Sequence, residues 1–177
     1  MHMDLPKRKK NRLENYDYST NGVCFVTICT HNRKKLFCDI VPSENGIVGA
    51  IHESPEIRLN TNGVIADNYI KKLAVRFGVM VEKYVIMPNH IHLLIAIRDD
   101  ERAIHESPLR KRSTLSIVIG YLKMNVSRDI HNNGYAGAVF QRSYHDHVVR
   151  NEKDYQEIWE YIENNPRKWA LDKYYEG

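Results

Sequence analysis

The chain is organised around residues 84 to 96, which read Tyr84-Val85-Ile86-Met87-Pro88-Asn89-His90-Ile91-His92-Leu93-Leu94-Ile95-Ala96. Two apolar runs flank a Pro-Asn dipeptide, which predicts a hairpin of two strands joined by a tight turn. Alternate side chains of a strand share one face, so His90 and His92 are expected to point the same way while Ile91 points into the core. Two imidazoles on one face can bind a single divalent ion, but ordinary strand histidines show the same spacing.

Length and composition indicate one domain. A chain of 177 residues is long enough for a single well-packed domain, so residues 1–177 are predicted to form one. No apolar run approaches the roughly 20 residues that span a bilayer, and no apolar segment follows the basic N-terminus. The three cysteines, Cys24, Cys29 and Cys38, are odd in number and lack C-x-x-C spacing. We therefore expect reduced thiols in a cytoplasmic protein with no membrane partner.

The positive charge is unevenly distributed along the chain. The net charge of +4 permits a polyanionic partner without requiring one. Two basic runs are candidate contacts to nucleic acid, one in an N-terminal arm over residues 1–20 and one in an aperiodic loop: Lys7, Arg8, Lys9, Lys10 and Arg12, and then Arg110, Lys111 and Arg112. A phosphate backbone would attract both runs, although a solvated tail or loop has the same composition. Residues 31–35 are predicted to form a further basic loop.

The apolar periodicity predicts an α+β fold. Core strands are expected at 23–29, 79–87, 90–97 and 139–149, and helices at 61–77 (capped by Thr61 or Asn62) and 113–131 (capped by Ser113). The order strand, helix, strand, strand, helix, strand is that of a ferredoxin-like or RNA-recognition-like antiparallel sheet with both helices on one face. The other face is left for a ligand or a third layer. Residues 36–40 and 46–51 are predicted to form a peripheral hairpin.

A final helix is predicted within residues 150–166, beginning at the cap Asn151 and ending at Pro166. Its apolar stripe should be buried against the body of the domain and consists of Tyr155, Ile158, Trp159 and Ile162. Tyr161 lies off that stripe, and Asn165 follows on the same flank one turn later. A tyrosine at this position can present its hydroxyl to a cleft, but one that only packs would fit as well.

A second H-x-H, His145-Asp146-His147, is the rival metal site on the predicted strand 139–149. Its central residue is charged, whereas Ile91 between the first pair is apolar. Lys123 and Arg150 could contact phosphates or could be solvated side chains.

Motifs in a characteristic order extend over nearly the whole chain. They are Tyr16-Asp17-Tyr18-Ser19, Phe25 to Thr30, Tyr84 to His92, Tyr121-Leu122-Lys123, Gln141-Arg142-Ser143-Tyr144 with Asp146-His147, Arg150 to Tyr155, Trp159-Glu160-Tyr161-Ile162 and Asn165-Pro166. In this order they resemble the REP-associated tyrosine transposases, a branch of the HUH single-strand DNA endonucleases. The combination is far more specific than the H-x-H spacing alone.

The resemblance implies a role for each site residue. His90 and His92 would bind a divalent ion, Mg²⁺ or Mn²⁺, and Asn165 would complete the metal site. Tyr161, carried by the C-terminal helix, would attack a phosphodiester and leave a 5′-phosphotyrosine and a free 3′-hydroxyl. A later 3′-hydroxyl could reverse that step and join strands without ATP. The resemblance keeps only the second histidine of the rival pair, so His147 is expected to support the site or to contact DNA.

The implied substrate is single-stranded or hairpin DNA, processed at the bacterial nucleoid. A monomer with its own tyrosine is expected, and a dimer is left open. Two other functions are left open. One is a domesticated, catalytically silent nucleic-acid-binding module on the same sheet, and the other is a metal-dependent hydrolase that uses activated water.

Overall fold

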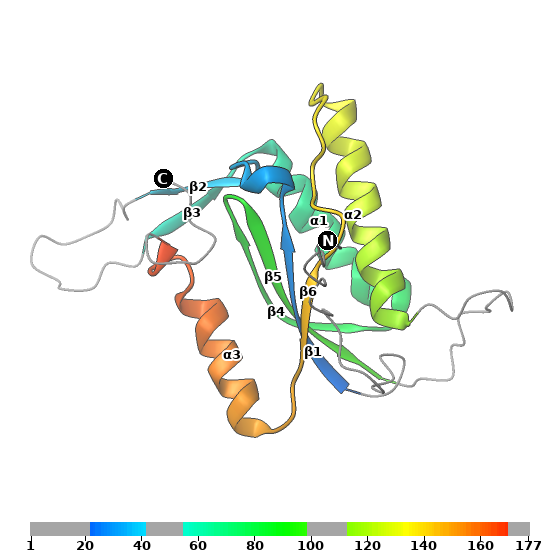
Figure 1. The fold of residues 1–177 in the computed structure, drawn as a ribbon, viewed down its shortest axis with the longest axis vertical. Helices are drawn as coiled ribbons and strands as arrows, with labels where there is room; N and C mark the ends of the chain where they lie inside the picture. Colours follow the sequence, from blue (N-terminus) through cyan, green and yellow to red (C-terminus); the bar gives the residue numbers. More distant parts are fainter. Residues whose placement is uncertain (1–21, 42–54, 99–112, 170–177) are drawn as a thin grey trace, which may run out of the picture.

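The structure is a computed structural model that describes residues 22–41, 55–98 and 113–169 (Figure 1). Its main sheet has the strand order β4-β5-β1-β6, and every neighbouring pair is antiparallel. The strands are β1 (Gly22–Cys29), β4 (Met80–Met87), β5 (His90–Ile97) and β6 (His145–Val148), and the helices are α1 (Thr61–Phe77), α2 (Thr114–Asn132) and α3 (Glu152–Asn164). The predicted ferredoxin-like α+β arrangement is therefore confirmed.

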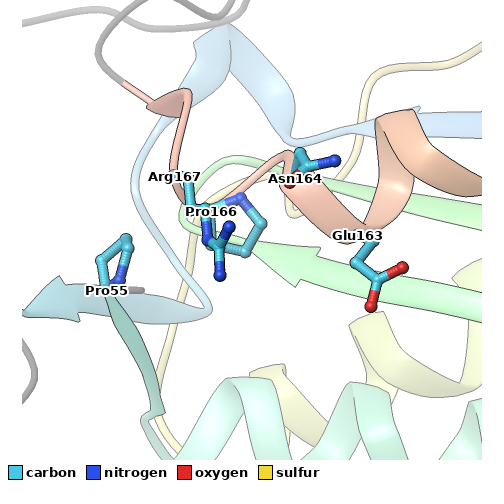
Figure 2. A pocket seen from close by; sticks show the side chains of 5 residues that line it. All are labelled: Pro55, Glu163, Asn164, Pro166 and Arg167. Carbon is cyan, nitrogen blue, oxygen red and sulfur yellow. The ribbon is translucent and has the colours of Figure 1, made fainter. Parts of the chain in front are cut away.

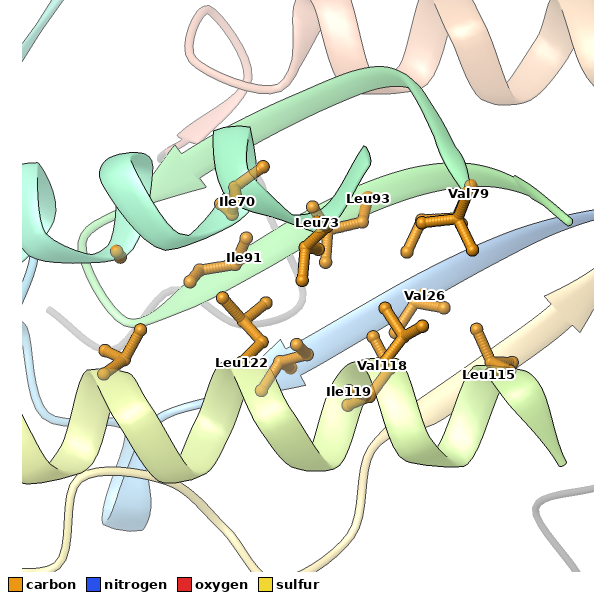
Figure 3. Close-up of a cluster of buried hydrophobic side chains, with 14 of the residues drawn as sticks. Val26, Ile70, Leu73, Val79, Ile91, Leu93, Leu115, Val118, Ile119 and Leu122 are labelled. Carbon is orange, nitrogen blue, oxygen red and sulfur yellow. The ribbon is translucent and has the colours of Figure 1, made fainter. Parts of the chain in front are cut away.

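Two layers cover the sheet. Helices α1 and α2 lie on one face, and α3 lies on the other (Figure 1). Figure 3 shows the core between the sheet and the first two helices, where Leu73 and Leu122 approach Ile91 and Leu93 of β5. β1 is a central strand of a sheet that is covered on both faces, which explains why both of its faces are mainly apolar. Its Val26 faces the core under α1 and α2.

A second apolar cluster lies between the sheet and α3. Val85, Met87 and Leu94 contact Ile158 and Ile162 there, as the predicted stripe requires. Three further contacts fix α3 to β4. The Tyr155 hydroxyl donates to Glu82 over 2.7 Å, and the Lys83 ammonium lies 3.1 Å from Glu163 and 4.1 Å from the centroid of the Trp159 ring. Burial and the Glu82 carboxylate raise the pKa of Tyr155 to about 12, so this hydroxyl stays a donor at neutral pH.

Helix caps decide where the helices begin. Ser113 and Asn151 cap α2 and α3 as predicted. The predicted cap of α1 was one or two residues late, because the side chain of Asn60 accepts from the N–H groups of Asn62 and Gly63 at 2.9 and 3.1 Å. Gly78 ends α1 in the left-handed conformation, at φ 66°.

Two strand predictions need correction. The observed partner of β2 (Cys38–Val41) is β3 (Glu56–Leu59), which alternates exposed and half-buried residues, whereas the predicted partner 46–51 lies outside the described residues. β6 is shorter than the predicted strand 139–149. Phe140 forms one isolated bridge with Thr30, but the carbonyls of Gln141 and Arg142 accept from Lys123 instead of continuing the ladder.

Among the residues described, no helix combines the length and the apolar character needed to cross a bilayer.

Candidate active site

The histidines of β5 share the face of the sheet that α3 covers. His90 and His92 are fully buried, and their ring centroids lie 4.4 Å apart. Ile91 between them points into the core on the opposite face, as the strand alternation predicts. The two imidazoles can therefore address one ion or one phosphate.

Each histidine is oriented by an oxygen at its Nδ1 atom. The Nδ1 of His90 lies 2.8 Å from the Oδ1 of Asn89, and the Nδ1 of His92 lies 2.9 Å from the hydroxyl of Thr27. An amide oxygen only accepts, so His90 Nδ1 donates its proton and the Nε2 of the neutral ring carries a lone pair. Partners of this kind fix the ring and the tautomer of histidines that bind metals.

Tyr161 lies beside the histidine pair. Its hydroxyl is 3.3 Å from His92 Nε2, and its ring meets the edge of Phe25 at 5.9 Å between centroids. Phe25 also contacts the ring of His92 at 5.1 Å. Tyr161 is 37% exposed as a residue, and its hydroxyl contact with His92 is partly buried.

The segment after Tyr161 brings a second aromatic ring close to the histidine pair. Trp169, eight residues later, lies 6.0 Å from His90 between ring centroids. Asn165 lies between these two aromatic residues in the sequence, continues the helical conformation and is buried, as is its Oδ1 atom. Tyr161 and Asn165 are four residues apart, which places them on one side of the helical segment that ends at Asn165.

The donor set suits a divalent ion that also binds phosphate. Within the described ranges no group of three or more His, Cys, Asp or Glu residues could hold a metal. Two neutral imidazoles bring no negative charge, so phosphate oxygens and water can supply the other ligands. The oriented rings of His90 and His92 therefore fit a metal that binds together with its substrate.

The second H-x-H has a different environment. His147 is half exposed, and its Nε2 lies 2.8 and 3.0 Å from the two carboxylate oxygens of Asp154 in the first turn of α3. Burial raises the pKa of Asp154, but the hydrogen bonds from His147 and the Arg150 N–H outweigh it and lower that pKa. His147 thus links β6 to α3, and its expected role as a support of the site or a DNA contact stays a prediction.

The predicted DNA contacts are only partly described. Lys123 donates to two backbone carbonyls, and burial lowers the pKa of its ammonium. Arg150 is exposed at the start of α3. The basic residues of the N-terminal arm and of residues 110–112 lie outside the described residues.

Sequence reasoning missed the roles of Thr27, Asn89, Phe25 and Trp169 at this site. A signal existed for Thr27, because it is a polar residue within an otherwise apolar central strand.

A pocket of about 310 Å³ lies at the end of α3 (Figure 2). Pro55, Glu163, Asn164, Pro166 and Arg167 line it. Neither histidine of β5 nor Tyr161 is among its lining residues, but two of these residues, Asn164 and Pro166, flank Asn165.

Comparisons with known proteins relate the chain to DNA transposases. No protein-family model matches the chain. An uncharacterized protein of Haemophilus influenzae is 31% identical over 183 residues, which cover 95% of this chain and 93% of that protein. A putative REP-associated tyrosine transposase of the same organism is 31% identical over 85 residues, 47% of each chain. A solved REP-associated tyrosine transposase bound to a REP hairpin has a TM-score of 0.59 at 20% identity, over 92% of this chain and 76% of that one.

The chain is similar to the REP-associated tyrosine transposases. The similarity in sequence covers about half of the named relative, and the similarity in structure shows a common fold. The resemblance predicted from the motifs is therefore confirmed. In this chain, the site described above lies on the sheet face that α3 covers.

Proposed function

We propose that the protein is a metal-dependent enzyme that nicks and rejoins single-stranded DNA through a covalent bond between DNA and Tyr161. The proposal rests mainly on one observation, the 3.3 Å distance between the Tyr161 hydroxyl and Nε2 of the buried His92. The relationship to the REP-associated tyrosine transposases supports a transposase-type, DNA-binding function at the coarser level.

The chemistry exchanges one phosphate ester for another. The Tyr161 oxygen forms a bond to phosphorus and releases its proton to solvent water, while the bond from phosphorus to the 3′-oxygen breaks. The electron pair of that bond stays on the 3′-oxygen, which leaves as a hydroxyl once it is protonated. The 5′-phosphate remains on Tyr161, so attack by another 3′-hydroxyl reverses the step and joins two strands.

The side chains of this site have separate tasks. When bound by His90, His92 and Asn165, Mg²⁺ or Mn²⁺ would neutralise the phosphate charge and polarise phosphorus. Phe25 and His92 hold the tyrosine ring, which lowers the entropic cost of bringing nucleophile and phosphate together. Tyr161 reaches His92 of its own chain, which supports a site complete in a monomer.

The proposed substrate is single-stranded DNA next to a hairpin. The solved neighbour is described as bound to a REP hairpin. A hairpin stem would be recognised mainly through its backbone charge and its shape. The flanking single strand would be bound through base stacking and charge.

Denaturing electrophoresis tests the proposal directly. Labelled hairpin oligonucleotides with single-stranded flanks are incubated with the full chain and Mn²⁺, and we expect a slowly migrating covalent adduct that EDTA prevents. Tight binding without an adduct on any hairpin would favour the catalytically silent binding module. Cleavage without an adduct would favour a hydrolase that uses activated water.

Loss of the Thr27 hydroxyl should weaken metal binding. Thr27→Val keeps the shape of a buried side chain but removes the oxygen that orients His92. Losing such a partner typically costs about 10- to 100-fold in metal affinity. Calorimetric titration with Mn²⁺ should show this loss, and Thr27→Ser should restore affinity because it returns the hydroxyl. Equal affinities of Thr27→Val and the native chain would contradict the expected role of Thr27.

A further inference from the structure

The basic loop after β1 adjoins the candidate site. It comprises residues 31–35 and includes the short helix η1 (His31–Arg33). Cys29 at the end of β1 pairs with His90, so the loop begins two residues beyond the strand position opposite a site histidine. The proposed function does not use this loop, although four of its five side chains are basic or can become so.

The loop is attached to the turn that leads into His90. The N–H of Thr30 donates to the Asn89 carbonyl over 2.9 Å, and the N–H of Leu36 donates to the Pro88 carbonyl over 2.7 Å. The buried Thr30 hydroxyl lies 2.8 Å from the Lys34 carbonyl and 2.9 Å from the Asn89 carbonyl. Both ends of the loop are therefore fixed to the Pro88-Asn89 turn.

The backbone of the loop is held in an unusual conformation. Asn32 and Arg33 have φ angles of 51° and 49°, in the left-handed region that non-glycine residues seldom adopt. Such conformations persist only where surrounding contacts impose them, and they cluster at functional sites. The loop is therefore held by these contacts, and its Lys34 and Lys35 are exposed, with the Lys34 ammonium 6.0 Å from the centroid of the Tyr135 ring.

We propose that the loop 31–35 binds backbone phosphates of the single DNA strand that Tyr161 attacks. These phosphates would be neighbours of the phosphate that forms the bond to Tyr161. This inference rests on the proposed function and adds the surface that holds the strand in place. Lysine and arginine side chains attract phosphates regardless of sequence. Because the backbone is already ordered, binding would not require the loop to fold first. The loop is anchored beside His90, so it lies next to the single strand that the site would cleave. We therefore assign it to the single strand and not to the hairpin stem.

Charge removal in the loop tests this proposal. The double variant Lys34→Gln/Lys35→Gln is compared with the control Lys71→Gln/Lys72→Gln. The control removes two exposed charges from α1, which lies on the sheet face opposite α3 and the candidate site. Both are made in the Tyr161→Phe background so that cleavage does not disturb binding. The probes are one hairpin with a single-stranded flank and the same hairpin without a flank, measured by fluorescence anisotropy over a range of salt concentrations.

The loop variant should bind the flanked hairpin about tenfold more weakly at 0.15 M salt, and the slope of log affinity against log salt should fall by roughly 1.4 in magnitude. The α1 variant should match its parent, and the blunt hairpin should be bound equally by all. Unchanged affinity of the loop variant, or an equal loss on the blunt hairpin, would overturn the proposal.

The result is independent of the adduct assay. A chain that forms no adduct but loses flank affinity in the loop variant would refute the proposed reaction and retain the loop as a binding surface. If the native chain forms the adduct, and the loop variant binds the flanked hairpin as tightly as its parent, the proposed reaction is supported and the loop proposal is refuted.

Discussion

Tyr161→Phe is expected to form no covalent DNA adduct while binding hairpin DNA as tightly as the native chain. The substitution removes one oxygen and keeps the ring that meets the edge of Phe25, so the geometry of α3 should persist. Loss of an attacking group typically lowers a rate by about 10³-fold or more. Denaturing electrophoresis with Mn²⁺ measures the adduct, and anisotropy measures binding.

Tyr155→Phe is the matched control for this experiment. It also deletes one tyrosine hydroxyl from α3, but that hydroxyl donates to Glu82 on β4 and not to a site histidine. We expect a somewhat less stable protein that still forms the adduct. If Tyr161→Phe cut DNA at the native rate, water and not tyrosine would be the nucleophile.

His90→Gln and His92→Gln are expected to lose Mn²⁺ binding and Mn²⁺-dependent adduct formation. Each removes an imidazole whose Nδ1 partner already fixes its orientation, and the loss should exceed the roughly 10- to 100-fold caused by removing an outer partner. A ligand that binds only the native state raises the unfolding temperature. Mn²⁺ should therefore stabilise the native chain against heat but neither variant.

The rival histidine pair supplies the control for the metal site. His145→Gln changes an exposed histidine of β6 and should leave Mn²⁺ affinity unchanged. Loss of Mn²⁺ affinity in His145→Gln, with normal affinity in His90→Gln, would move the metal to the second H-x-H.

Local patterns in the sequence predicted the core elements well. The bounds of α1 and β5 follow from helical periodicity and from an uninterrupted apolar run, both of which are local signals. The pairing of β2 with β3 was missed because Glu56–Leu59 is a short alternation of charged and apolar residues whose partner is set by the tertiary fold. The late start of β6 was missed because the segment before it contacts Lys123, which comes from a different element.

In the candidate site, too, some features follow from local sequence patterns and others depend on the tertiary fold. The common face of His90 and His92 follows from the two-residue period of a strand. The approach of Tyr161 to His92 depends on how α3 is laid across the sheet, which no local pattern specifies. The motif resemblance, and not the periodicity, singled out Tyr161 before the structure placed it there.

The central position of β1 has a consequence for how the chain is made. β1 is the first strand of the sheet to be synthesised, but its neighbour β5 begins about 70 residues later and β6 later still. At about 5 to 20 residues per second, the ribosome needs roughly 4 to 14 seconds to supply β5. During that time a strand that is apolar on both faces has neither partner, which makes the nascent chain prone to aggregation. Slower initiation or a lower growth temperature should therefore raise the yield of folded protein without any change in its stability.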